Sequence, residues 1–157
     1  MNPDLLNHAL GNCGALTVLG LSAIGSALGT GIAAQAAIGA WKRNYAQGKQ
    51  ASFMLLAFVG APLSQTIYGL ILMMIMFSSA QKGMPWQGLV GIGIAAGLPI
   101  GFSAWLQGKA AAAASDAMGE TEKGFTNDLA ALGIVETVAI FVMVLAILAL
   151  TLFSPVS

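Results

Sequence analysis

Four long apolar segments, separated by short polar connections, limit what this chain can fold into. The segments cover roughly residues 12–40, 51–79, 87–118 and 126–153. Each is long enough to cross a bilayer as a helix, because a crossing needs about 20 apolar residues. The connections cover residues 41–50, 80–86 and 119–125. Links this short make neighbouring helices antiparallel. We therefore expect an all-α membrane protein with four transmembrane helices.

The composition excludes several other classes of protein. Of the 157 residues, 57% are hydrophobic and only 8% are charged, whereas soluble domains carry about a quarter charged residues. The net charge is zero and no basic cluster exists, so we expect no nucleic-acid partner. A single cysteine, Cys13, excludes an internal disulfide and a multi-cysteine metal site. Little of the protein is expected outside the membrane.

The helices group into two similar hairpins, residues 1–79 and residues 80–157, which form one integral-membrane unit. The sequence Leu-Ser-Gln-Thr-Ile around Gln65 matches Ile-Val-Glu-Thr-Val around Glu136. Such internal similarity indicates a duplicated hairpin. If the match holds, Gln65 occupies the place of Glu136, and a chain of four helices has one charged site.

Basic residues predict how the helices are oriented, because Lys and Arg accumulate in cytoplasmic loops. The first and third connections contain four of them, Lys42, Arg43, Lys49 and Lys123, whereas the middle connection contains only Lys82. We expect residues 41–50 and 119–125 to face the cytoplasm and both termini to lie outside.

The first and third segments repeat small residues every three or four positions. These residues are Ser22, Gly25, Ser26, Gly29, Ala33 and Ala37, then Gly93, Gly97, Gly101, Ala104, Gly108, Ala111, Ser115 and Gly119. Small residues allow helix backbones to approach closely in membranes. The second and fourth segments are bulkier and suit contact with lipid. Two arrangements fit this pattern: a ring of many subunits with the small-residue helices inside, or a single tightly packed four-helix bundle.

Glu136 is the one acidic residue inside the otherwise uncharged run from residue 129 to residue 153. To place an ionised carboxylate in the middle of a bilayer costs roughly several kcal/mol of free energy. Because of this cost, acidic residues at that depth are rare and usually mark functional sites. Other mid-depth polar residues are Ser64, Gln65, Thr66, Tyr68, Gln107 and Thr137. Hydroxyl, amide and carboxylate oxygens suit a hard cation, and no cluster of thiolates or imidazoles is present for a transition metal.

Pro62 lies just before the polar residues of the second segment. It cannot donate a hydrogen bond to the carbonyl of Phe58, and its ring strains the local turn. Freed backbone in a membrane is tolerated where protein, water or an ion satisfies it. Simple geometry points to the Phe58 carbonyl as a ligand, and the bend could also loosen the Ala61 carbonyl; a kink that serves packing alone is the other reading.

These motifs resemble a known family. Pro62-Leu-Ser-Gln-Thr-Ile-Tyr-Gly69, Gln107-Gly-Lys109 and Val135-Glu-Thr137 are similar to the proteolipid rotor-ring (K or c-type) subunit of V-type ATPases. The likeness is greatest to the bacterial kind that translocates Na⁺, and it extends over essentially the whole chain. Two departures are that Ser64 stands where threonine is usual and Ala61 where a larger apolar residue is usual.

The resemblance implies a role for each site residue. Glu136 would be the ion-binding carboxylate, with Gln65, Gln107 and Ser64 as oxygen ligands together with the backbone carbonyl of Ala61. Tyr68 would bond to Glu136 without touching the ion. We place Thr137 with Tyr68, beside the ligands rather than among them.

The resemblance also implies a function. The chain would belong to a homo-oligomeric ring and would have no organic cofactor and no catalytic activity of its own. ATP-driven rotation would move the ring past a stator subunit with an essential arginine, and the ring would carry Na⁺ as it turns. Central-stalk subunits would dock at residues 41–50 and 119–125, and a bacterial plasma membrane suits the family. Sodium needs roughly five or six oxygens to replace its water, which this set supplies. Two alternatives stay open: the same rotor carrying H⁺, and a free-standing four-helix ion transporter or channel.

Overall fold

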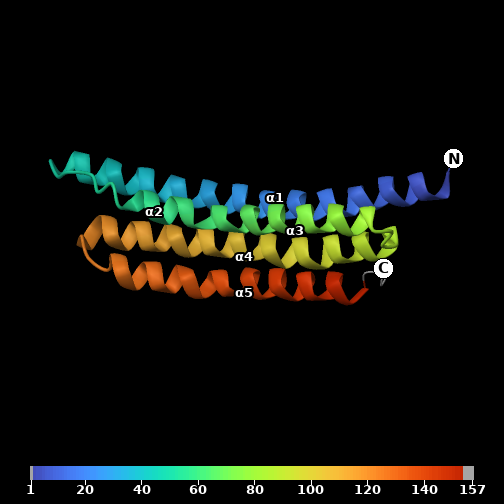
Figure 1. Cartoon of the computed structure of the whole chain (residues 1–157). Coiled ribbons are helices and arrows are strands. Elements are labelled where there is room, and N and C mark those ends of the chain that lie inside the picture. The colour runs from blue at the N-terminus through green and yellow to red at the C-terminus, as the bar shows by residue number, and fades with distance from the viewer. Residues whose placement is uncertain (1, 154–157) are drawn as a thin grey trace.

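The computed structural model describes residues 2–153 of the chain, and in that range the fold is helical throughout. Four helical spans are long and apolar enough to cross a membrane: Pro3–Ala46, Leu55–Gln81, Trp86–Thr121 and Phe125–Phe153. They run side by side and alternate in direction, and α1 begins at the end of the bundle where α5 ends (Figure 1). The predicted all-α fold with four transmembrane helices is confirmed. The terminal residues themselves, residue 1 and residues 154–157, lie outside the described range.

The first helix, α1 (Pro3–Ala46), is longer than its apolar segment at both ends. At its start the Asn2 side chain accepts a hydrogen bond from the Asp4 amide at 3.0 Å, and Pro3 occupies the first turn. Both features favour a helix start. At the other end the helix stops at Gln47, and Gly48 then adopts a φ of +69°. The predicted loop 41–50 is therefore about half helical, because apolarity reports the hydrocarbon boundary rather than the helix boundary.

The second span is interrupted, as Pro62 predicts. It consists of α2 (Leu55–Gly60), a 3₁₀ turn η1 (Ala61–Leu63) and α3 (Ser64–Gln81). The other two spans are the single helices α4 (Trp86–Thr121) and α5 (Phe125–Phe153). The last two connections are consequently shorter than the predicted residues 80–86 and 119–125.

The small-residue stripes form the contact between α1 and α4. All the stripe residues named above are buried. A Cβ added at Gly25 would lie 2.0 Å from the carbonyl oxygen of Gly101, and one added at Gly108 would lie 2.2 Å from the Cα of Gly29. Only glycine permits backbones to approach so closely. Within one chain, α1 and α4 are thus the central pair, with α3 packed on α1 and α5 packed on α4.

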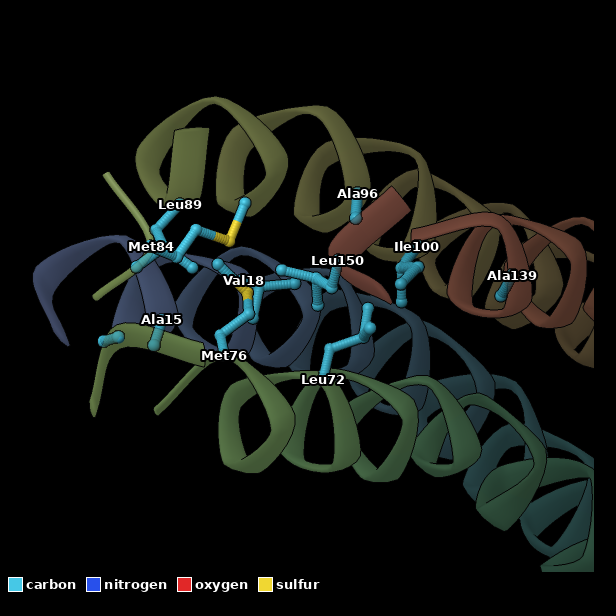
Figure 2. Close-up of a cluster of buried hydrophobic side chains, with 11 residues drawn as sticks. Ala15, Val18, Leu72, Met76, Met84, Leu89, Ala96, Ile100, Ala139 and Leu150 are labelled. Atoms are coloured by element: carbon cyan, nitrogen blue, oxygen red, sulfur yellow. The ribbon is translucent and has the colours of Figure 1, made fainter. Parts of the chain in front are cut away.

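Two apolar clusters lie on either side of the middle of the bundle. One of them, drawn in Figure 2, gathers residues such as Val18, Leu72, Ile100 and Ala139. The other, nearer the loops 41–50 and 119–125, contains Ala33, Phe58, Ala111 and Leu132 among its members. On every helix the mid-depth polar residues fall between members of these two clusters. The fold therefore encloses one polar layer between two apolar layers.

Ion pairs join the ends of α1 and α4. Arg43 contacts Asp116 and also Glu120, the latter at 2.8 Å, and Lys49 lies 3.3 Å from Glu122. These side chains are largely exposed, so each pair contributes about 1 kcal/mol or less to stability. The pairs bring the first and third connections to the same end of the bundle, as the alternating helices require.

Candidate functional site

The bend at Pro62 brings a backbone oxygen into the polar layer. The Ala61 carbonyl accepts the backbone N–H of Ser64 and, at 3.1 Å, the Ser64 hydroxyl. In an uninterrupted α-helix this carbonyl would bond only to the residue four positions ahead. The structure therefore places Ala61, rather than the simple geometric candidate Phe58, beside the predicted ligand Ser64.

Two buried glutamines connect α3 to α4. The Ser64 hydroxyl lies 3.1 Å from Oε1 of Gln65, and Nε2 of Gln65 donates to Oε1 of Gln107 at 2.7 Å. Both glutamines have an exposed fraction of 0%. Buried amides need partners for both of their ends. These contacts turn both amide oxygens toward the other polar groups of the layer.

Glu136 lies at the other end of this network, on α5. Its Oε1 accepts a hydrogen bond from the Tyr68 hydroxyl at 2.5 Å, and its Oε2 lies 3.4 Å from Nε2 of Gln107. The same Nε2 donates to the Leu132 carbonyl at 3.0 Å. Glu136 is partly buried, so it lies at the edge of the chain rather than in its core.

Five predicted ligand groups thus gather in one network that spans three helices. They are the Ala61 carbonyl, the Ser64 hydroxyl, the amide oxygens of Gln65 and Gln107 and the Glu136 carboxylate. Every donor atom is an oxygen, which favours a hard cation. Within residues 2–153, no group of three or more His, Cys, Asp or Glu side chains is placed to hold a metal ion.

The charge of Glu136 has no basic partner within the described part of the chain. The ion pairs found there all lie at the loop end and involve Arg43 and Lys49. Lys109, two positions from Gln107, instead lies over the Trp105 ring at 4.2 Å from its centre. Hydrogen bonds alone do not cancel a charge at membrane depth, so a proton or a cation has to do so when Glu136 faces lipid.

One predicted site residue lies apart from the network. The Thr137 hydroxyl donates to the Ile134 carbonyl of its own helix at 2.7 Å, and Thr137 is exposed. Hydroxyls in helices commonly bond back in this way. Within residues 2–153 the hydrogen bond seen for the Thr137 hydroxyl therefore runs to its own helix and not to a ligand group, although Thr137 is adjacent to Glu136 in sequence.

Two contacts of the site were not predicted from the sequence. They are the Leu132 carbonyl that accepts from Gln107, and Ser103, whose hydroxyl donates to the Val135 carbonyl at 3.1 Å. Ser103 lies one helical turn before Gln107 and so shares its face. That spacing could have indicated that Ser103 lies near the site. The two carbonyls that accept the hydrogen bonds could not be predicted, because they depend on how α5 packs against α4.

Comparison with protein families adds an independent finding. The family model of the ATP synthase C-subunit matches residues 13–76 and again residues 90–149. The first match contains Ser64 and Gln65, and the second contains Gln107 and Glu136. A search of curated protein sequences found no match. The family match covers most of the chain, and its two copies agree with the predicted repeat.

Proposed function

Because the chain belongs to the ATP synthase C-subunit family, we propose that it is a rotor-ring subunit of a V-type ATPase that carries Na⁺ at a site centred on Glu136. Members of the family are non-catalytic, ion-translocating membrane proteins that assemble into rings against a stator subunit. ATP hydrolysis takes place on other subunits. The family membership argues against the alternative of a free-standing transporter or channel.

One observation carries the choice of Na⁺: four neutral oxygen groups are connected to Glu136 in a single network. A proton site needs only a carboxyl group and apolar surroundings. Na⁺ requires several oxygens in place of its water, and the amide oxygens of the two fully buried glutamines can supply two of them. The ligands that we propose are Glu136, Gln65, Gln107, Ser64 and the carbonyl of Ala61.

The other polar residues have supporting tasks in this proposal. Tyr68 holds one carboxylate oxygen of Glu136, which leaves the second oxygen, beside Gln107, for the ion. Ser64 keeps the hydroxyl that the family usually takes from threonine. Thr137 was predicted beside the ligands, and in this proposal its hydroxyl bonds to Ile134 of its own helix and holds no ligand.

The transport cycle follows from the need to neutralise Glu136. Bound Na⁺ neutralises the carboxylate of Glu136 while the subunit faces lipid. When the ion leaves, the essential arginine of the stator neutralises the carboxylate instead. Moving one elementary charge against 100 mV requires about 2.3 kcal/mol. ATP-driven rotation supplies this energy as each subunit in turn passes the stator.

The remaining predictions form part of the same proposal. Residues 1–79 and 80–157 are the two hairpins of the repeat. The loops 41–50 and 119–125 face the cytoplasm and dock the central stalk, both termini lie outside, and the membrane is a bacterial plasma membrane. The ion pairs that join α1 to α4 support the placement of both loops on one side.

Carbodiimide labelling of Glu136 in the purified ring, near neutral pH, tests the choice of ion. The reagent attacks a protonated carboxyl group, so bound Na⁺ should slow the labelling. The protection should need more Na⁺ in a Gln107→Ala ring. Labelling that ignores Na⁺ and responds only to pH would identify a proton rotor and refute the argument from the glutamines.

A further inference from the structure

Ser103 makes a contact between helices just beside the candidate site. It is 5% exposed, and its hydroxyl donates to the backbone carbonyl of Val135, at 3.1 Å. Val135 immediately precedes Glu136. The hydroxyl of a helical serine normally bonds to a carbonyl of its own helix, as Ser79 does with Ile75. Ser103 instead reaches across to α5.

The contact matters because few polar interactions hold α5 in place. Most of α5 is exposed, and near the middle of the helix four side-chain hydrogen bonds, from the three donors Tyr68, Ser103 and Gln107, join it to the other described helices. These reach Val135, Leu132 and Glu136, all within about one turn. Burial of apolar surface gives little net attraction between helices in lipid, because lipid is as apolar as the side chains, so close packing and hydrogen bonds hold the helices together. Beside the packing of residues such as Leu132 and Ala139, this group of bonds therefore helps to set the depth and rotation of α5 near Glu136.

Among the three donors, Ser103 has a distinct position. Tyr68 contacts the carboxylate of Glu136 directly, and Gln107 contacts it as well as the Leu132 carbonyl. Ser103 contacts the backbone of α5 alone. With Gln107 one turn away, it fixes α5 at two points close to Glu136, so the carboxylate oxygen stays beside the Gln107 amide.

We propose that Ser103 is a positioning residue for the ion site, which sets the affinity of the site without touching the ion. The inference rests on the proposed role of Glu136 as the ion carrier, but not on whether the ion is Na⁺ or H⁺. Without the hydroxyl, α5 is free to shift, and the contact between Glu136 and Gln107, already 3.4 Å long, is the first to lengthen.

A pair of variants with the same shape isolates the hydroxyl. Ser103→Thr keeps it, whereas Ser103→Val replaces it with a methyl group. Ser103 borders a groove of about 650 Å³ between α4 and α5, lined also by Leu106 and Val138, and both variants add the same branched side chain there. Any effect of bulk is therefore common to the two. A serine-to-alanine change at Ser79, which is similarly buried but bonds only to its own helix, is the control.

The first readout is equilibrium binding of ²²Na⁺ to purified rings. We expect Ser103→Val to need roughly threefold more Na⁺ for half-saturation than Ser103→Thr, the size typical of one hydrogen bond between membrane helices. Ser79→Ala should bind like the unmodified ring. Equal half-saturation in the Thr and Val rings would overturn the proposal.

The second readout keeps the two proposals separable. If the unmodified ring binds no Na⁺, the sodium proposal fails, and Ser103 is judged by the rate of carbodiimide labelling of Glu136 at one fixed pH without Na⁺. That rate should differ roughly threefold between the Val and Thr rings, because a shifted α5 changes the hydrogen bonds of the carboxyl group. Equal rates would again overturn the inference.

Discussion

The two hairpins have the same plan but contribute different chemistry to the site. Each pairs a long helix rich in small residues with a bulkier helix, and each is matched by the same family model. In the first hairpin the bulkier helix is broken at Ala61–Leu63 and carries the fully buried Gln65. In the second, α5 is continuous and carries the partly buried Glu136.

This difference shows how a duplicated unit can form one site rather than two. The first hairpin contributes neutral oxygens, including the Ala61 carbonyl that the bend turns toward the Ser64 hydroxyl, and the second contributes the carboxylate of Glu136. Gln107, on α4, contacts both Gln65 and Glu136. Neither hairpin alone contains the full set of proposed ligands, so under the proposed function the chain as a whole would bind one ion.

The largest expected effect comes from making the hairpins alike. Glu136→Gln leaves an amide in both and removes the only acidic side chain of the polar layer. Loss of a charged ligand costs about 3 kcal/mol, roughly a hundredfold in affinity, and a permanently neutral site cannot respond to the stator. ATP-driven ²²Na⁺ uptake by vesicles that contain the assembled ATPase should stop. Asp4→Asn, at an exposed carboxylate in the first turn of α1 and at the opposite end of the bundle from the loops 41–50 and 119–125, should retain uptake.

The next effect concerns the contact that joins the hairpins. Gly25→Ala places a Cβ 2.0 Å from the Gly101 carbonyl oxygen, so α1 and α4 must separate. Gly31→Ala is the matched control, because an added Cβ there meets nothing of its own chain within 4 Å. We expect few intact rings from Gly25→Ala after detergent extraction and normal amounts from Gly31→Ala, as judged by gel filtration. Equal yields would mean that this contact does not hold the hairpins together.

Gln65→Ala sharpens the comparison by removing the side chain that corresponds to Glu136. It deletes a proposed ligand and leaves Gln107 without a partner for its buried oxygen. An unpartnered buried group costs about 1–3 kcal/mol, which is roughly a tenfold to hundredfold rise in half-saturating Na⁺. Titration of carbodiimide protection with Na⁺ measures this. Unchanged protection would show that the first hairpin contributes no ligand through Gln65.

Tyr68→Phe should have the smallest effect on sodium binding. The Tyr68 hydroxyl bonds to the carboxylate of Glu136, and this bond can persist in both the empty and the loaded site, so most of its energy cancels. We expect about a threefold loss of Na⁺ affinity, as for one hydrogen bond between membrane helices. Equilibrium binding of ²²Na⁺ to purified rings measures this loss. A loss as large as that of the Glu136→Gln ring in the same binding measurement would mean that Tyr68 is itself a ligand.

Much of this arrangement was predictable because the membrane imposes simple rules. The four spans follow from apolar length, and the break follows from Pro62. The polar layer follows because few polar residues occur at that depth. Helix ends were less predictable: α1 begins at Pro3 rather than near residue 12, since the Asn2 cap and ordinary helix formers extend a helix beyond the hydrocarbon.

The details of the polar layer depend on how helices sit against each other, which one sequence does not contain. Ser103 and Thr137 are both hydroxyl residues close to the site, yet Ser103 bonds across to α5 and Thr137 bonds back to its own helix. That the Ala61 carbonyl lies beside the Ser64 hydroxyl likewise depended on the 3₁₀ turn. In each case the side-chain type was informative, and the partner was set by packing.

The most direct test of the account is the number of Na⁺ ions bound per chain in the purified ring, measured by equilibrium binding of ²²Na⁺ near neutral pH. The account predicts one ion per chain, lost in the Glu136→Gln ring because that change removes the charge that holds the ion. Two ions per chain would mean that each hairpin forms its own site, and no binding at any pH would refute a sodium site at Glu136.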